Sequence, residues 1–155
     1  MNKFSAFIRC FSVVSLCVFS LAVRPTFAAG AVEMQVEHIL VQSIDEYNLA
    51  MESSDSSGLM KYFTDNVQRR SPLSEQTGKK DFSEYFAWEF KTFQAKYVTK
   101  KIIVSGRSAA ILFVWEAIHK ASGTPLKIEM VAIYDLASSG KFDSVSYYYD
   151  TAKAG

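Results

Sequence analysis

Glu89 is one of two candidate proton carriers in this sequence. It stands on the stripe of a predicted helix that carries Phe82, Tyr85, Phe86 and Phe90. Burial among such rings would raise the pKa of a carboxylic acid and suit it to general acid or base chemistry. A second interpretation places Glu89 at the edge of the stripe, where its carboxylate reaches water.

His119 is the second candidate proton carrier. In a strand it would share one face with Trp115 and Ala117, whereas Glu116 would lie on the other face. A register slip of one residue would exchange the two faces. We favour Trp115 and His119 as the inward residues, because the alternative leaves the indole outside. The two histidines outside the leader, His38 and His119, lack the spacing of a metal site, so no metal and no cofactor is predicted.

His119 and Trp115 lie on a long predicted β-hairpin. Residues 111–134 contain two runs rich in β-branched and aromatic residues, separated by a loop with Gly123 and Pro125. Helices are predicted over residues 32–53, 56–63 and 79–96, from apolar residues at helical spacing. Further strands are predicted over residues 67–71, 97–104 and 142–150. The pattern predicts an α+β fold in which a curved antiparallel sheet forms a cone with three N-terminal helices on its concave side.

Residues 1–28 have the pattern of a cleaved secretory signal peptide, and residues 29–155 form the single predicted domain. Lys3 and Arg9 precede an apolar run, and small residues follow it. We expect cleavage after Ala28, with Ala29 as the alternative, and a secreted or periplasmic protein without a membrane span after processing. Both cysteines lie in the leader, so no disulfide is expected in the mature chain. The near-neutral charge indicates no nucleic-acid partner.

The order of these elements resembles the nuclear transport factor 2-like superfamily, the cystatin-like cone. Residues 59–66 with Tyr47 and Asp55 are similar to the first helices of ketosteroid isomerases and SnoaL-like polyketide cyclases. Residues 134–135, 140–142 and 146–149 are similar to their last hairpin. The resemblance covers residues 33–151 and implies a fold that hosts isomerases, cyclases and binding proteins, so it leaves the activity open.

The resemblance assigns only one of three isomerase residues to a matching side chain. Tyr47 falls at the position of the oxyanion tyrosine, but Ser71 replaces the aspartate base and Met130 replaces the protonated aspartate. A serine without an adjacent base cannot abstract a proton next to a carbonyl. We therefore expect no steroid isomerase reaction. The catalytic candidates are Tyr47 as donor and His119 or Glu89 as proton carrier.

The faces implied by the resemblance also define a mostly apolar pocket. Its predicted ligand-binding residues are Arg69, Ser71, Trp115, Met130, Tyr134 and Tyr149. Arg69 would either lie solvated at the rim, pair with Glu89 or Asp150, or bind an anionic group of a ligand.

Two functions follow as hypotheses. The first is an exported domain that binds a small organic ligand and carries out acid–base chemistry on it without a cofactor. The second is a non-catalytic interaction or assembly module of the cell envelope. The resemblance further implies a homodimer through the convex sheet face, which would carry Glu129, Val131, Ile133 and Tyr148.

Overall fold

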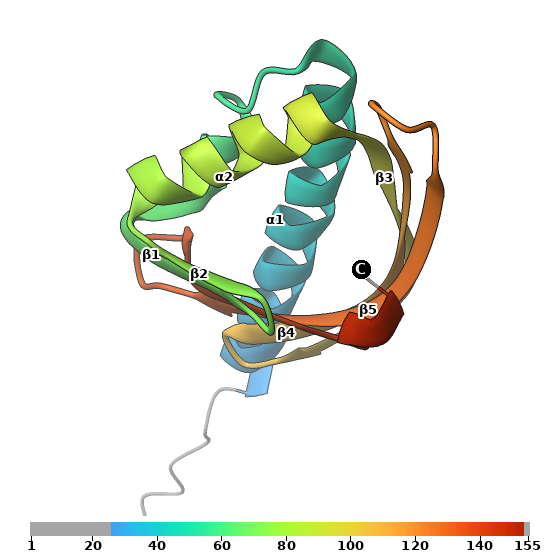
Figure 1. The fold of residues 1–155 in the computed structure, drawn as a ribbon. Coiled ribbons are helices and arrows are strands. Elements are labelled where there is room, and N and C mark those ends of the chain that lie inside the picture. Colours follow the sequence, from blue (N-terminus) through green and yellow to red (C-terminus); the bar gives the residue numbers. More distant parts are fainter. Residues whose placement is uncertain (1–25, 154–155) are drawn as a thin grey trace, which may run out of the picture.

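The computed structural model describes residues 26–153 and shows two α-helices held in the curve of a six-stranded sheet (Figure 1). The predicted signal peptide lies outside the described residues except for its last three, which begin the first helix. In the described part of the chain, no helix is both long and apolar enough to cross a membrane.

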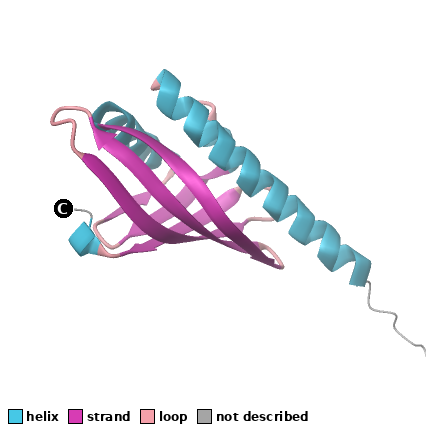
Figure 2. Ribbon diagram, turned by 90° about the vertical axis from the view of Figure 1, so that its right-hand side faces the viewer, coloured by secondary structure: helices cyan, strands magenta, loops and turns pink. Residues whose placement is uncertain are grey.

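Helix α1 spans Thr26–Ser53 and begins before residue 32, where apolar spacing had placed its start. Its buried residues recur every three or four positions, as an amphipathic helix requires: Val36, Leu40, Ile44, Tyr47 and Met51. The helix ends at Ser53, and Ser54 after it adopts a positive φ of 58°. Figure 2 shows α1 running along one side of the twisted sheet.

The prediction of three helices was wrong. Residues 56–63 form only a short 3-10 helix, Leu59–Tyr62, which buries Leu59 and Met60. The third predicted helix is α2, Lys79–Thr92, and it stops four residues early. Phe93 already belongs to the next strand, because its extended backbone is paired with the hairpin strand through His119.

The sheet has the order β2-β1-β6-β5-β4-β3. The strands are β1 (Phe63–Ser71), β2 (Ser74–Thr77), β3 (Phe93–Ser105), β4 (Ser108–His119), β5 (Pro125–Leu136) and β6 (Phe142–Tyr149). The predicted hairpin is β4–β5, which lies between β6 and β3 in the antiparallel part of the sheet. A wholly antiparallel sheet was the wrong expectation, since β1 pairs with β6 in parallel. Strand β2 occupies residues that resembled a polar loop.

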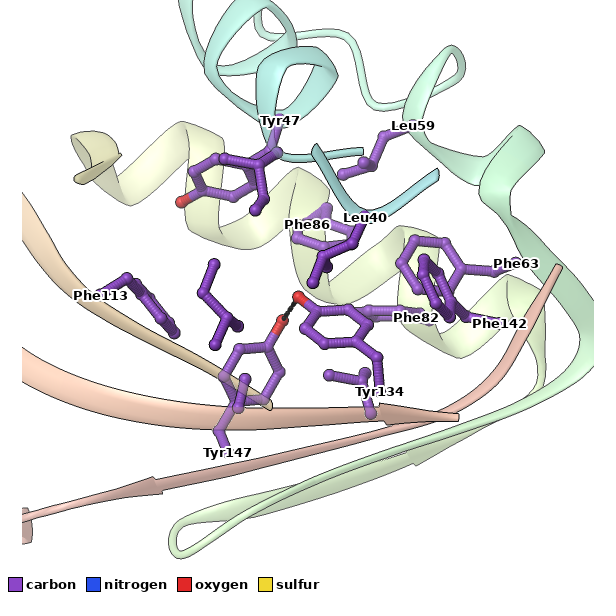
Figure 3. Packing of buried hydrophobic residues seen from close by; sticks show 14 of the residues in the cluster. Leu40, Tyr47, Leu59, Phe63, Phe82, Phe86, Phe113, Tyr134, Phe142 and Tyr147 are labelled. Carbon is purple, nitrogen blue, oxygen red and sulfur yellow. Dashed lines mark hydrogen bonds between the residues drawn. The ribbon is translucent and has the colours of Figure 1, made fainter. Parts of the chain in front are cut away.

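Aromatic residues fill one end of the concave core. The Phe63 ring lies 4.8 Å from Phe82 and 6.2 Å from Phe142, measured between centroids. Tyr134 packs on Phe142 at 5.0 Å, and its hydroxyl lies 3.3 Å from that of Tyr147 (Figure 3). This end of the cone is therefore closed by side chains, and any ligand site must lie beyond Tyr147.

Candidate functional site

A cavity of about 120 Å³ lies beyond this packed end, between α2 and the concave face of the sheet. More than half of its lining residues are aromatic. The lining consists of Arg69, Leu73, Tyr85, Trp88, Glu89, Phe93, Tyr97, Trp115, Leu126, Ile128, Met130, Tyr147 and Tyr149. Only Arg69 and Glu89 in this set carry a formal charge. The cavity thus combines an apolar wall with two opposite charges.

Glu89 is buried, with 4% of its surface exposed, and is held by a short hydrogen-bond chain. Trp115 Nε1 donates to the Tyr47 hydroxyl at 3.2 Å, and that hydroxyl donates to Glu89 Oε1 at 2.9 Å. The second carboxylate oxygen, Oε2, has no hydrogen-bond partner among the described residues. A buried polar atom without a partner costs free energy, which a hydrogen bond to a bound molecule would recover. Oε2 is therefore the atom best placed to accept a proton from such a molecule or to donate one to it.

Burial raises the pKa of Glu89 from 4.5 to about 7. The Tyr47 hydrogen bond, the positive charge of Arg69 and the indole N–H of Trp115 act in the opposite direction. Desolvation outweighs these three interactions, because the carboxylate lies among rings of low polarity. Near neutral pH the side chain therefore populates both its neutral and its ionised forms.

Arg69 is equally buried, with 5% of its surface exposed. Its Nη1 donates to Gln76 Oε1 at 2.8 Å and to Ser74 Oγ at 3.1 Å, both on β2. Its guanidinium carbon lies 3.7 Å from the centroid of the Tyr85 ring, in cation–π geometry. It forms no ion pair with any described residue, and its Nε has no hydrogen-bond partner. Arg69 is thus neither a solvated rim residue nor a partner of Glu89 or Asp150.

The structure brings together most of the residues singled out from the sequence. Arg69, Glu89, Trp115, Met130 and Tyr149 all line the cavity. Tyr47 does not reach it, but stands behind Glu89 and Trp115 as the link between them. The inward orientation of Trp115 agrees with the favoured register, since Glu116 lies on the other face and bonds to Lys96 and Lys127.

Besides Tyr47, three predicted site residues lie outside the cavity lining. Ser71 is the last residue of β1, and its hydroxyl bonds to Ser74 across the β1–β2 turn. Tyr134 is enclosed in the packed end of the core. His119 ends β4, and its Nδ1 lies 3.0 Å from the hydroxyl of Ser122 in an exposed turn. His119 does not line the cavity, although its half-buried ring packs edge-on against the lining residue Phe93, with 5.5 Å between the ring centroids.

Several lining residues were not recognised as such from the sequence. Tyr85 and Phe93 had been assigned to a core stripe, and Trp88 and Leu73 had no assigned role. Tyr97 pairs with Trp115 across the β3–β4 ladder, so its side chain points to the same face. The strand alternation of residues 93–97 could have placed Tyr97, but only if the helix had been ended at residue 92.

A larger groove of about 980 Å³ lies at the hairpin end and next to the C-terminal end of α1. It shares Tyr97 and Leu126 with the small cavity. Its charged lining residues are Glu52, Lys96, Glu116, Lys120 and Lys127, which are solvent-facing or paired with one another. The small cavity is therefore the candidate site, because it holds the buried groups without partners.

The part of the chain that the structure describes contains no group of three His, Cys, Asp or Glu residues able to hold a metal ion. What the geometry provides instead is a carboxylic acid of raised pKa facing an apolar chamber together with a guanidinium group. The fold is thus an α+β cone that encloses such a chamber.

Comparison with known proteins gives the family. Residues 44–145 match the SnoaL-like domain, so the chain belongs to the SnoaL-like family of the nuclear transport factor 2-like superfamily. No curated protein sequence matches the chain.

Solved structures agree with this assignment. SalBIII, an epoxide hydrolase/cyclase-like enzyme in pyran ring formation of the polyether salinomycin, superposes with a TM-score of 0.69 at 19% identity, over 78% of this chain and 95% of its own. A protein from Jannaschia sp. CCS1 described as a SnoaL-like polyketide cyclase gives 0.68 at 14% identity, over 79% and 90%. A nuclear transport factor 2-like protein from Anabaena variabilis gives 0.65 at 14%, over 75% and 90%. At these identities the similarity shows the fold alone.

Proposed function

We propose that this protein binds a small, mostly apolar organic acid in the cavity and carries out acid–base chemistry on it without a cofactor. The observation that carries the proposal is the pair of unpartnered atoms, Glu89 Oε2 and Arg69 Nε, on two residues that line one cavity. A site that leaves two buried polar atoms without partners gains stability from a ligand that satisfies them.

The cavity limits the group that it can take. An engineered protein cavity of about 150 Å³ binds benzene, so a chamber of 120 Å³ fits a group close to one small ring. The aromatic walls favour a flat or unsaturated group. The guanidinium group of Arg69 favours a carboxylate or another anionic end.

Glu89 takes the role of proton carrier in this proposal, and Tyr47 orients it. A group with a pKa near the working pH is the most efficient general acid or base. His119 does not line the cavity, so Glu89 is the proton carrier in this proposal. Cyclase and epoxide-opening reactions, which the name of SalBIII mentions, are proton-transfer reactions of a kind that one such carboxylic acid could assist. The absence of aspartates at positions 71 and 130 supports a reaction other than steroid isomerisation.

The first experiment measures the melting temperature of the protein in a library of aromatic and aliphatic acids. We expect a rise with some small aromatic acids, which Arg69→Ala abolishes. Arg70→Ala is the matched control, since its side chain is largely exposed on the other face of the same strand. If no compound shifts the melting temperature of the unmodified protein, the ligand-binding proposal fails.

Export and dimerisation belong to the same proposal. The pattern of residues 1–28 supports a secreted or periplasmic protein. Val131, Ile133 and Tyr148 support a homodimer, because they lie partly exposed and side by side on the convex face.

This convex surface also supports the second candidate function, a non-catalytic interaction module of the envelope. In that case the apolar face meets another protein and the cavity is only a packing defect. The acid library separates the two candidates, since a module of this kind shows no ligand-dependent stabilisation.

A further inference from the structure

Two of the large apolar side chains that the structure leaves exposed stand at the same cavity. Leu73 is 64% exposed and Trp88 is 54% exposed, and both line the 120 Å³ chamber. They come from separate elements, the β1–β2 turn and helix α2. Single exposed apolar residues are ordinary, but two that meet at the mouth of an apolar cavity mark a surface on which a ligand can lie.

Both residues are held in place by the structure around them. The Trp88 ring packs against Tyr85 at 5.6 Å and against Phe93 at 5.9 Å, so half of it faces outward from a fixed position. Leu73 precedes Ser74 on the hairpin whose Ser74 and Gln76 side chains hold Arg69. The apolar rim is therefore connected to the charged group inside the cavity.

The size of the chamber makes this rim significant. A space of 120 Å³ accommodates about one ring, and a molecule with more carbon atoms must extend out of it. We infer that the ligand is an amphiphilic carboxylic acid whose ring-sized, acidic head occupies the cavity between Arg69 and Glu89, and whose apolar tail leaves across Leu73 and Trp88. This inference rests on the proposed function and specifies its ligand class.

The alternative exit is the large groove at the hairpin end, which meets the cavity at Tyr97 and Leu126. Tyr97 is fixed there, because its ring stacks on Tyr47 at 3.9 Å and its backbone N–H donates to Asn48 Oδ1 at 3.0 Å. A tail that left by this route would have to pass a pinned aromatic ring. The rim formed by Leu73 and Trp88 needs no such movement.

The test is a calorimetric titration of the purified protein with benzoate, 4-propylbenzoate and 4-hexylbenzoate. Each methylene group that leaves water for an apolar surface raises affinity by about fourfold at most. We expect affinity to increase along the series in the unmodified protein. We expect Leu73→Ala and Trp88→Ala to reduce this increase severalfold, measured within each variant as the ratio of its affinity for 4-hexylbenzoate to its affinity for benzoate.

Two control variants locate the tail. Leu49→Ala removes an exposed apolar side chain of α1 that lines neither space, and Ile118→Ala removes one that lines the large groove. Both should retain the full increase. Melting temperatures of all four variants confirm folding, which these exposed positions should not disturb.

The outcomes separate the inference from the function beneath it. If benzoate binds in an Arg69-dependent way but the longer acids bind no tighter, the tail is excluded and the proposed function stands. An increase that survives Trp88→Ala and Leu73→Ala, or that is lost in Ile118→Ala, overturns the inference as well. If none of the three acids binds, both the amphiphilic ligand and the proposed binding of small aromatic acids are wrong.

Discussion

The Tyr47 hydroxyl donates a hydrogen bond of 2.9 Å to Glu89 Oε1, joining α1 to α2 across 42 residues of sequence. Trp115 Nε1 completes the chain from the sheet. One carboxylate oxygen is thereby committed to the protein, and the other stays without a partner. The hydrogen bond to Oε1 fixes the orientation of Glu89, and Oε2 is left as the oxygen that a ligand could contact.

Glu89→Gln should change the pH dependence of stability. The pKa of Glu89 is raised on folding, so the free energy of unfolding of the unmodified protein falls as pH rises from 4.5 to about 7. Glutamine removes this dependence and can still accept the Tyr47 hydrogen bond. As pH rises from 4 to 8, the free energy of unfolding of the unmodified protein should fall relative to that of Glu89→Gln by up to about 3 kcal/mol. Urea unfolding at the two pH values measures it, and parallel pH profiles of both proteins would contradict a raised pKa.

Tyr47→Phe should raise the pKa of Glu89 further, because the Tyr47 hydrogen bond stabilises the ionised carboxylate and the variant lacks it. It should also cost about 1–3 kcal/mol of stability, since Glu89 Oε1 and the Trp115 N–H both lose a partner. NMR titration of the labelled Glu89 carboxyl carbon measures the pKa. Tyr134→Phe is the matched control, because it breaks only the contact with Tyr147. An unchanged Glu89 titration in Tyr47→Phe would show that the hydrogen bond has no influence on the proton.

Binding of a carboxylate ligand should weaken as pH rises above about 7. The ligand is ionised throughout this range, and its negative charge is repelled by ionised Glu89 but not by the neutral acid. Affinity should fall by up to tenfold per pH unit on the basic side, with proton uptake on binding. Calorimetry of benzoate binding in buffers of different ionisation enthalpy measures both. Glu89→Gln should give a flat profile, and a fall in affinity that persists in this variant would assign the titration to another group.

Tyr148→Glu should dissociate the proposed homodimer. Tyr148 pairs with Val131 in the β5–β6 ladder and is exposed on the convex face, so a charge there would be buried without a partner in a dimer. Sedimentation at micromolar concentration should give a dimer for the unmodified protein and a monomer for the variant. A monomer in both would remove the dimer from the proposal. Arg70→Glu is a control at an exposed position on the outer part of the sheet.

The mature protein should begin at Ala29. Expression of the full chain in a bacterium, followed by fractionation and intact-mass measurement, tests cleavage after Ala28 and export together. Cleavage after Ala29 is the alternative, and both would remove only the first few residues of α1, well before the buried Val36. A protein that retains residues 1–28 in the cytoplasmic fraction would contradict export.

Local pattern was sufficient for much of this molecule. Apolar residues recur every three or four positions over residues 36–51, which indicates a helix. Buried and exposed side chains alternate along much of β4 and β5, on either side of a Gly-containing turn, which indicates a hairpin. The same signals failed where local pattern competes with long-range pairing. Phe93 continues the aromatic stripe of α2 by spacing, yet pairing with His119 takes it into β3. Strand β2 has no apolar residue at all and forms only because β1 supplies its hydrogen bonds.

The sequence by itself indicated the α+β class, and through its family resemblance the cone, and it singled out Arg69, Glu89 and Tyr47 as residues of interest. It favoured an inward Trp115 but left the hairpin register open. Only the tertiary structure decided how they act. It buried Glu89, directed Tyr47 onto that carboxylate, held Arg69 by the unforeseen β2, and left His119 at the end of its strand. Burial and hydrogen-bond partners arise from residues far apart in the chain, so periodicity can indicate the face of a side chain but not the groups it meets there.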